Sequence, residues 1–551
     1  MIKFLLAPFN AYFHRIQRSR LRQMMRGYRN LKKAGRLDCI AAVKQELTVQ
    51  KIGIDGKLFS PLIFGAGLAS AELVVRQYLL VRIGGINLNR ALLLAAGKPD
   101  TRVVFSMPSE WGDVIERHGF EVDRFRSTVL WAMYVTALLL YGCMKIGNTA
   151  LKSLASVASP CRKLKPYVYF ADLVPSNLPQ EAQGQPSHNI VSWYLQWDGR
   201  KPHIEAIHHS VPKTVCKILG NVDLNTQPAP LPEMVGLSEL INYFGWSLSA
   251  AVIATLDLLR GRWWHALLLN QVALAAQARV ISTDCLAQEY LFHNSNWIYR
   301  PLWTYEAERN GSLITFYFYS TNSQYFDNKS NCSPVPYGWK AANWPRYLVW
   351  DKYQERFIRD AVGGMGSILV VGEIWFQDSR ECALTLSHNS VAVFDVQPLR
   401  DSKYQLLGAG YEYYTPDTAV KFLEDIHAVV EELQIDMVFK RKREIYDEAH
   451  PSYRSFVNSL SGSSHVVAIP PSISAVRLVE DCACIAVISM PFTSTALLGK
   501  FQGKPSVYYD SCAKVVKGDC AAHGIDTLVG KEELRAWLKA VLLKSKVSTN
   551  T

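Results

Sequence analysis

The sequence lacks the motifs that mark several familiar nucleotide and metal sites. Its 11 cysteines include no CxxC pair, and only Cys482 and Cys484 lie close together, so neither a zinc site nor a disulfide framework is predicted. No GxxxxGK[ST] stretch is present, so the letters DEAH at Asp447–His450 do not indicate a helicase. No metal is predicted, because cations and helix dipoles can neutralise a single phosphate.

Acidic residues are absent from the first 36 residues, which carry ten Lys or Arg in a chain of net charge +12. Such a basic helix or arm suits nucleic acid, an anionic membrane surface or plain solvation. The apolar start MIKFLLAPFNAYF favours the membrane surface. No nucleic-acid partner is predicted, because these bases supply most of the excess charge and no nucleic-acid-binding signature follows.

One uncharged run, Ser127–Met144, has 18 residues, which is the short limit for a transmembrane helix. Its Thr and Tyr residues favour a buried or interfacial helix, and a single membrane span remains the alternative. A second apolar run, Trp246–Leu259, is interrupted by Asp257 and predicts a core helix.

Length and composition predict a globular protein of two or three domains, since 551 residues include 49% apolar and 20% charged residues. We expect a basic leader at 1–65. An N-terminal α/β domain at 66–355, on the acceptor side, would include the hydrophobic helix 127–144. A nucleotide-sugar-binding domain at 356–551 would follow. The predicted fold is α/β, with two Rossmann-like domains facing a cleft.

Strands and helices alternate most regularly in the C-terminal half, which indicates a parallel sheet covered on both faces. The expected strands there are 367–374, 390–398, 435–443, 465–470, 484–489 and 506–510, and the expected helices are 415–434, 451–460 and 472–481. In the N-terminal half, strands are expected at 101–105, 166–174, 189–197, 203–211, 278–283, 296–308 and 313–321.

Three groups of polar residues follow predicted strands of the C-terminal half. Lys440, Arg441 and Arg443 belong to a basic run, His450 precedes the helix at 451–460, and Thr493, Ser494 and Thr495 follow the strand at 484–489. A solvated charge run, a cap histidine and a helix N-cap are the plain interpretations. Because the carboxyl ends of parallel strands share one sheet edge, the three groups together predict a site for a nucleotide phosphate.

Three carboxylates are candidates for the catalytic chemistry: Glu373, Asp395 and Asp198. Glu373 and Asp395 follow strand-like runs, so their carboxylates could face the cleft as general base or nucleophile. A capping or turn role is the plain interpretation of each.

The stretch Pro491-Phe492-Thr493-Ser494 resembles the motif of bacterial polysaccharide-biosynthesis proteins named for Pro-Phe-Thr-Ser. The order of elements is also similar to that of sialyltransferases and related enzymes that use CMP-activated keto-sugar acids. Their His-Pro and Ser-Thr motifs match His450-Pro451 and Ser494-Thr495. The resemblance implies a GT-B fold and a CMP-linked nonulosonate or Kdo-type donor. The acidic pair that precedes a glycine in those enzymes is missing here.

The sequence therefore predicts a glycosyltransferase of surface polysaccharide biosynthesis. Its substrates would be a CMP-linked sugar and a glycan or lipid-linked glycan, with no further cofactor. It would be cytoplasmic and peripherally attached to the inner membrane. The alternatives are a transferase that uses a UDP- or GDP-sugar and a non-catalytic assembly protein with a degenerate GT-B fold.

Overall fold

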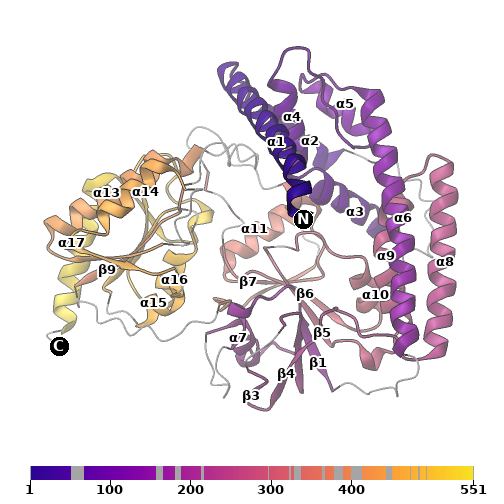
Figure 1. Ribbon diagram of the computed structural model, residues 1–551. Coiled ribbons are helices and arrows are strands. Elements are labelled where there is room, and N and C mark those ends of the chain that lie inside the picture. Colours follow the sequence, from indigo (N-terminus) through magenta and orange to yellow (C-terminus); the bar gives the residue numbers. More distant parts are fainter. Residues whose placement is uncertain are drawn as a thin grey trace.

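The computed structural model of the chain describes residues 2–50, 52, 68–156, 165–179, 188–212, 216–295, 297–321, 324, 326–327, 337–362, 366–377, 389–398, 412–441, 449–471, 473–481, 484–491 and 493–549. Two parallel sheets, each covered by helices, stand side by side (Figure 1). These are two Rossmann-like domains, which confirms the predicted α/β fold class.

The N-terminal sheet has eight strands in the order β3-β4-β2-β1-β5-β6-β7-β8, and only β3 is antiparallel to its neighbour. The four residues of central strand β1, Tyr-Val-Tyr-Phe, are all buried, as expected for a parallel strand covered on both faces. The strands are β1 (Tyr167–Phe170), β2 (Ala206–His209), β3 (Ile218–Leu219), β4 (Val222–Thr226), β5 (Glu289–His293), β6 (Leu313–Tyr317), β7 (Arg346–Val349) and β8 (Ser367–Val370).

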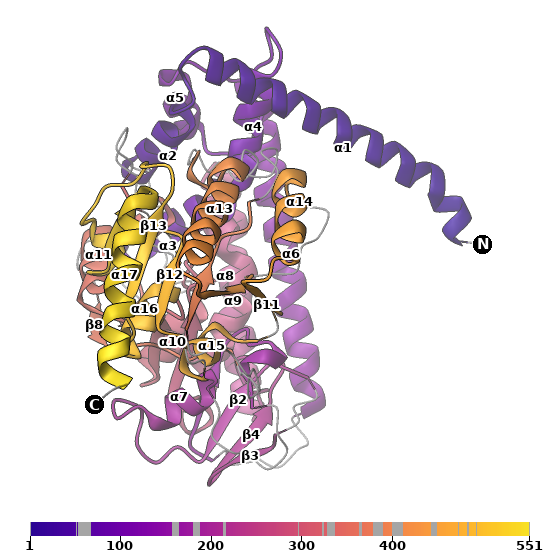
Figure 2. The same cartoon turned by 90° about the vertical axis from the view of Figure 1, so that its left-hand side faces the viewer.

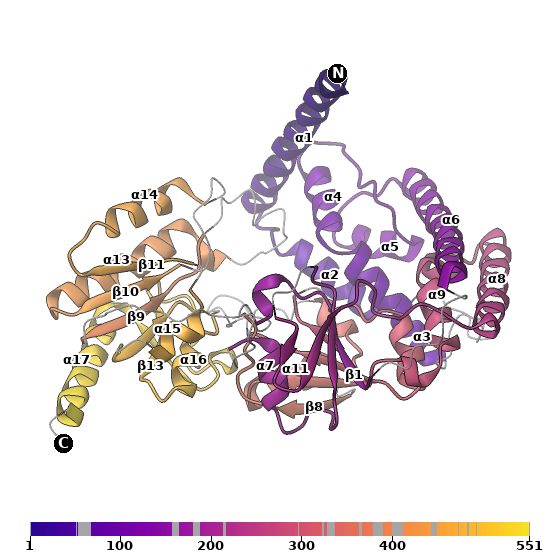
Figure 3. The same cartoon turned by 60° about the horizontal axis from the view of Figure 1, so that its bottom comes forward.

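Helices pack around this sheet and extend beyond it (Figure 1). They are α1 (Ile2–Lys33), α2 (Cys39–Val49), α3 (Leu68–Tyr78), α4 (Ile86–Ala96), α5 (Ser109–Arg117), α6 (Arg124–Ser156), α7 (Ile190–Gln196), α8 (Leu237–Leu259), α9 (Trp264–Val280), α10 (Trp303–Arg309) and α11 (Lys352–Val362). The long helices α6, α8 and α9 lie together on the flank opposite the C-terminal domain (Figure 3).

The predicted basic helix at the N-terminus forms as α1, which projects from the body of the molecule (Figure 2). Its C-terminal half packs against α4, where a Cβ on Gly27 would lie 1.9 Å from the Leu93 carbonyl oxygen. The Gln23 amide also donates to the Leu94 carbonyl at 2.9 Å. This close helix crossing, which only glycine permits, joins the basic segment to the N-terminal domain.

The C-terminal sheet has six parallel strands in the order β11-β10-β9-β12-β13-β14. Numbered along the chain within the domain, this is the 3-2-1-4-5-6 order of dinucleotide-binding folds. The strands are β9 (Ser390–Phe394), β10 (Asp436–Lys440), β11 (Val466–Ile469), β12 (Ala486–Ser489), β13 (Ser506–Asp510) and β14 (Asp526–Val529). The helices are α13 (Pro416–Glu432), α14 (Pro451–Leu460), α15 (Ala475–Asp481), α16 (Thr495–Phe501) and α17 (Gly530–Thr549).

Most elements predicted in the C-terminal half are confirmed, including the start of α13. Thr415 is the N-cap, its hydroxyl accepts the Thr418 N–H at 3.2 Å, and Pro416 occupies the first helical turn. The strand expected at 367–374 forms as β8, but it pairs with β7 and so belongs to the N-terminal sheet. An apolar run indicates a strand without indicating which strand it pairs with.

Several strand predictions in the N-terminal half are wrong. Residues expected as strands at 189–197 and 296–308 contain helices α7 and α10, and 101–105 forms only an isolated bridge through Val103. The first three residues of the run 278–283 form the end of α9. In α7, the Asn189 side chain accepts the N–H groups of Val191 and Ser192, and this cap outweighs the strand preference of the β-branched and aromatic residues.

The two domains meet through residues in or between strands of both sheets. His523 Nδ1 lies 2.9 Å from both carboxylate oxygens of Asp351. The Val516 N–H donates to the Asp327 carbonyl at 2.9 Å, and the ring of Phe326 packs on that of Tyr508 at 5.2 Å. These contacts place the β13–β14 side of the C-terminal domain against the N-terminal domain.

Candidate functional site

The strand order of the C-terminal sheet creates a topological switch point between β9 and β12. The chain leaves β9 toward β10 on one side and leaves β12 toward β13 on the other. In open parallel sheets, ligands bind outside the carboxyl ends of the strands at such a point. Asp395 follows β9, and the loop Met490–Thr495 follows β12. The Met490 N–H donates to the Phe394 carbonyl at 2.9 Å, so the two strand ends are adjacent.

Two of the three motif hydroxyls are held inside the protein. The hydroxyl of Thr493 donates to the Met490 carbonyl at 2.9 Å and lies 3.1 Å from that of Thr495, which in turn lies 2.8 Å from Ser489 Oγ. Ser494 occupies the N-cap position of α16 but makes no capping hydrogen bond. Ser494 is therefore the one of the three whose hydroxyl remains available to a ligand.

His450 is the N-cap of α14, close to the position expected from the sequence. Its Nδ1 accepts the Ser452 N–H at 3.4 Å and lies 2.7 Å from Ser452 Oγ. The backbone N–H of His450 donates to the Pro398 carbonyl at 3.2 Å, which connects α14 to the segment after β9. Because Nδ1 acts as the acceptor, the hydrogen-bond pattern assigns the ring proton to Nε2, as a donor for a ligand.

Asp395 is buried, at 3% exposure, rather than facing open solvent. Its Oδ2 accepts a hydrogen bond from the Tyr453 hydroxyl on α14, while its Oδ1 is buried without a hydrogen-bond partner among the described residues. Burial raises the pKa of Asp395 to about 6, and the Tyr453 hydrogen bond and the nearby charges of Arg441 and Lys440 oppose the rise. Asp395 thus joins the His450 helix to the end of β9.

The basic run begins at the end of β10, next to this carboxylate. Lys440 is the last strand residue and is 7% exposed, and its Nζ donates to the Arg441 carbonyl at 3.2 Å. Arg441 is half-buried. Arg443 lies outside the described residues. The structure therefore brings Lys440, Arg441, Asp395 and His450 to one edge of the sheet, beside the motif loop.

The other two predicted carboxylates lie elsewhere. Glu373 follows β8 of the N-terminal sheet, and its Oε1 accepts from Gln502, at the far end of α16, at 3.3 Å. Burial raises the pKa of Glu373. Asp198 is exposed in the turn after α7, at the amino ends of the strands, so it does not join the carboxyl-edge residues.

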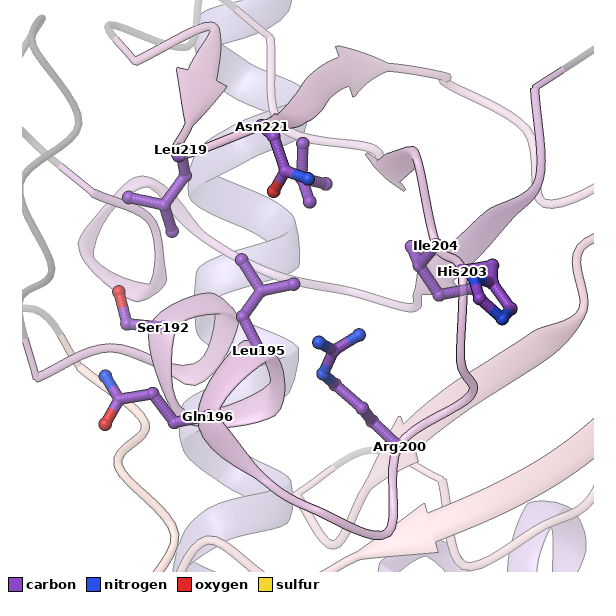
Figure 4. A pocket seen from close by; sticks show the side chains of 10 residues that line it. Ser192, Leu195, Gln196, Arg200, His203, Ile204, Leu219 and Asn221 are labelled. Carbon is purple, nitrogen blue, oxygen red and sulfur yellow. The ribbon is translucent and has the colours of Figure 1, made fainter.

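A cavity of about 450 Å³ opens beside the Asp198 turn, at the amino ends of β2 and β4. The Arg200 guanidinium reaches into it between Leu195 and Ile204 (Figure 4). This cavity therefore lies at the amino edge of the N-terminal sheet and does not belong to the switch point between β9 and β12. Among the described residues, no cluster of His, Cys, Asp and Glu is arranged to hold a metal ion.

The N-terminal sheet has its own switch point between β1 and β5, which the sequence analysis missed. His293 ends β5 and is 3% exposed, and its Nε2 lies 3.4 Å from the carbonyl of Asp172, which follows β1. Its Nδ1 is buried without a partner among the described residues. Burial lowers the pKa of His293. A polar residue directly after a strand was the available signal, but the run Glu289–His293 was not identified as a strand.

Asp395 makes the stability of the fold depend on pH. Its folded-state pKa of about 6 lies above the ordinary 3.8. The stabilising contribution of its protonated form to the free energy of unfolding is therefore fully present below the ordinary pKa and is lost as the pH rises through about 6. Between about pH 4 and pH 7 the unfolding free energy should fall by about 3 kcal/mol through this group.

Asp395→Asn keeps an acceptor for Tyr453 and removes the titration, so its urea-unfolding free energy should lack this fall. Asp198→Asn, at an exposed carboxylate, is the control and should leave the pH profile unchanged. If the unfolding free energies of wild type and Asp395→Asn differ by the same amount at every pH, the raised pKa of Asp395 is contradicted.

The fold and this site define an α/β protein of two Rossmann-like domains with a polar cluster at the C-terminal switch point. The chain belongs to the family of polysaccharide biosynthesis PFTS motif proteins, whose family model matches residues 246–538, more than half of its length. This confirms the family resemblance read from Pro491–Ser494. No curated protein matches the chain.

Solved structures give weak matches. A UDP-GlcNAc 2-epimerase from Methanocaldococcus jannaschii aligns at 7% identity over 69% of this chain and 92% of its own, with a TM-score of 0.34. An α,α-trehalose-phosphate synthase from Burkholderia xenovorans aligns at 9% identity over 69% and 95%, with a TM-score of 0.31. A UDP-glucosyltransferase from Polygonum tinctorium aligns at 11% identity over 68% and 82%, also with a TM-score of 0.31. Similarity this low carries no information about the ligands of this chain.

Proposed function

We propose that the chain is a GT-B type glycosyltransferase of bacterial surface polysaccharide biosynthesis. It transfers a nonulosonate or Kdo-type keto-sugar acid from a CMP-activated donor to a lipid-linked or surface glycan. The observation that carries the proposal is that Arg441 and His450 follow β10 and Ser494 follows β12, at the carboxyl edge of the C-terminal sheet. These residues supply a hydroxyl, an imidazole N–H and a guanidinium, which are donors suited to one phosphate. Membership of the polysaccharide biosynthesis family supports the biological setting.

In this proposal the residues of the C-terminal domain divide between binding and positioning. Ser494, His450 and Arg441 hold the donor phosphate, and Lys440 contributes positive charge. Asp395 and Tyr453 act as positioning residues, because their hydrogen bond attaches the N-terminus of α14 to the end of β9. Thr493 and Thr495 shape the motif loop through the hydrogen bond between their hydroxyls. The basic leader helix keeps the enzyme near a membrane-borne acceptor, on the cytoplasmic side of the inner membrane.

We assign the acceptor base to His293 of the N-terminal domain. Its Nε2 faces a carbonyl oxygen and therefore carries the ring proton, which leaves a lone pair on the unpartnered Nδ1. Burial lowers its pKa, so the imidazole is neutral at cytoplasmic pH and able to take a proton from an acceptor hydroxyl. This assignment replaces the carboxylate bases predicted from the sequence.

Nucleotide binding tests the donor half of the proposal. CMP should raise the melting temperature of the full chain, whereas UDP, GDP and ADP should not, because a ligand that binds only the native state stabilises it. Ser494→Ala combined with His450→Asn should weaken CMP binding by at least about tenfold, as expected when hydrogen bonds to a charged group are lost. Calorimetric titration measures the change.

The variants are chosen so that folding is retained. Asn at position 450 remains a good N-cap for α14, and Ser494 makes no capping bond that could be lost. Ser455→Ala, at an exposed position of α14, is the matched control and should bind CMP normally. Stabilisation by UDP or GDP alone would reject the CMP donor and keep a transferase. No response to any nucleotide would favour a non-catalytic assembly protein.

A further inference from the structure

The exposed half of α6 is apolar where a water-facing helix is normally charged. Every exposed residue from Thr128 to Met144 is uncharged, and Met133, Leu140 and Met144 are exposed by 63%, 60% and 70%. The surface of a soluble helix usually places its polar face outward. Contiguous exposed apolar surface of this kind marks an interaction site.

Helix α8 adds a second apolar stripe, although the sequence predicted a core helix there. Exposed apolar side chains recur at intervals of three or four residues, except for one interval of seven between Ile241 and Leu248: Leu237, Ile241, Leu248, Val252, Leu256 and Leu259. Their exposed fractions range from 46% at Leu256 to 80% at Leu259. Asp257, at 5% exposure, lies on the buried side of α8, so the exposed stripe is on the other side of the helix.

The two stripes belong to one surface. The Tyr243 hydroxyl near the start of α8 donates to the Ile146 carbonyl late in α6 at 3.3 Å, while Trp131 early in α6 packs on Trp263 just after α8 at 5.1 Å. The helices are therefore antiparallel neighbours, and they lie side by side on the outer flank of the molecule (Figures 1 and 3). We call the exposed apolar residues of α6 and α8 the flank face.

Both helices are attached to α9 by their opposite sides, which argues against a membrane span. Helix α6 is long and apolar enough to cross a bilayer over Arg124–Leu154, with 28% of that window buried inside the protein. Its Val135 and Leu139 are buried in the core. On α8, Asp257 forms a buried pair with His265 of α9 at 2.6 Å. Crossing the bilayer would remove α6 from this packing and uncover the apolar surface of α9.

Charge complementarity indicates what covers the flank face. The charged residues beside the apolar stripes are mainly basic: Lys145, Lys152 and Arg260, together with Arg126, which pairs with Asp123 at 3.4 Å. The acidic Glu239 at the start of α8 is occupied by the backbone N–H groups of Val235 and Gly236. Apolar side chains bordered by bases are the pattern of helices that lie in the plane of an anionic membrane.

We propose that the flank face is a membrane-docking surface, on which α6 and α8 lie in the interface of an anionic bilayer without crossing it. The inference rests on the proposed membrane-borne acceptor, and it specifies the surface that meets the membrane. It assigns docking to the helices 124–156 and 237–259 rather than to the basic leader alone.

Vesicle binding by the full-length protein tests the proposal. Wild type should co-float with vesicles of phosphatidylglycerol and phosphatidylcholine and bind pure phosphatidylcholine more weakly. Leu140→Glu combined with Leu248→Glu should lower the partition coefficient on the mixed vesicles by at least about tenfold, because both charges enter the docked face. Ile218→Glu, at a 55% exposed apolar residue of β3, is the matched control and should bind like wild type.

Cys143 gives an independent readout on the same face. It is exposed on α6, whereas Cys512 of the C-terminal domain is half-buried away from it. Mixed vesicles should slow maleimide labelling of Cys143 and leave the rate at Cys512 unchanged. Labelling rates are measured by mass spectrometry of the digested protein.

Three results would overturn the inference. The first is that the double variant binds vesicles as tightly as wild type. The second is that vesicles do not slow the labelling of Cys143. The third is that, in the absence of vesicles, light scattering shows a wild-type dimer and a monomeric double variant. The last result would make the flank face an interface between two copies. CMP-induced stabilisation of the double variant is measured in parallel, so a loss of docking is distinguished from a failure of the proposed donor site.

Discussion

Replacing His523 with leucine is expected to separate the unfolding of the two domains. His523 is 1% exposed and faces Asp351 across the domain boundary. Burial acts to raise the pKa of Asp351, but the hydrogen bond and charge of His523, together with the N–H groups of Gln354 and Tyr353, hold that pKa below its ordinary value. Removing one member of a buried pair leaves the other without compensation, at a cost of about 3–5 kcal/mol.

Differential scanning calorimetry of the full chain measures this effect. Wild type should unfold with coupled domains, whereas His523→Leu should show a lower first transition and a second, separate one. Part of the loss could come from backbone strain, because His523 has a φ of 54°. His523→Asn controls for strain, since asparagine tolerates the left-handed region and keeps an N–H donor.

Asp351→Asn tests the pair from the other side. Asp351 Oδ1 accepts the N–H groups of Tyr353 and Gln354 at the start of α11, and asparagine retains that capping acceptor. The domains should again uncouple, although less than in His523→Leu. A single transition at an unchanged temperature in both variants would show that the pair does not join the domains.

Replacing His293 with glutamine is expected to lower kcat by at least about 10²-fold in the proposed transfer reaction, the range for a lost general base. CMP binding should be unchanged, because His293 belongs to the N-terminal sheet and the proposed phosphate-binding residues belong to the C-terminal sheet. In wild type, the acid limb of kcat/KM should lie below pH 6.5, since burial lowers the pKa of His293 from that value. This limb should be absent from the variant.

His208→Gln is the matched control for His293→Gln. His208 lies on β2, which β1 separates from β5 in the same sheet, and its pKa is also lowered by burial. Both of its ring nitrogens are engaged, Nδ1 with Gln227 at 2.6 Å and Nε2 with Asn225 at 3.3 Å. It therefore has no lone pair for the acceptor, and its replacement should leave the pH profile intact. Equal losses in the two variants would reject His293 as the base.

The candidate site was predictable only in part. Asp395, Lys440 and the motif loop could be predicted as site residues, because each follows a short apolar run that is recognisable as a strand in the sequence. The inward hydrogen bonds of Thr493 and Thr495 were not visible, since they depend on Ser489 and on the turn at Met490. The burial of Asp395 likewise depends on Tyr453, 58 residues away along the chain.

The sequence by itself determined the alternating strands and helices of the C-terminal half, the basic helix α1 and the position of the motif loop. Each of these follows from local periodicity, capping and charge. Only the tertiary structure decided which sheet β8 joins, that α7 is a helix, that His293 ends a strand at a switch point, and that α6 and α8 expose apolar faces. Strand pairing and burial are set by segments far apart in the chain, so an apolar run looks the same whether its partner is the core or a surface.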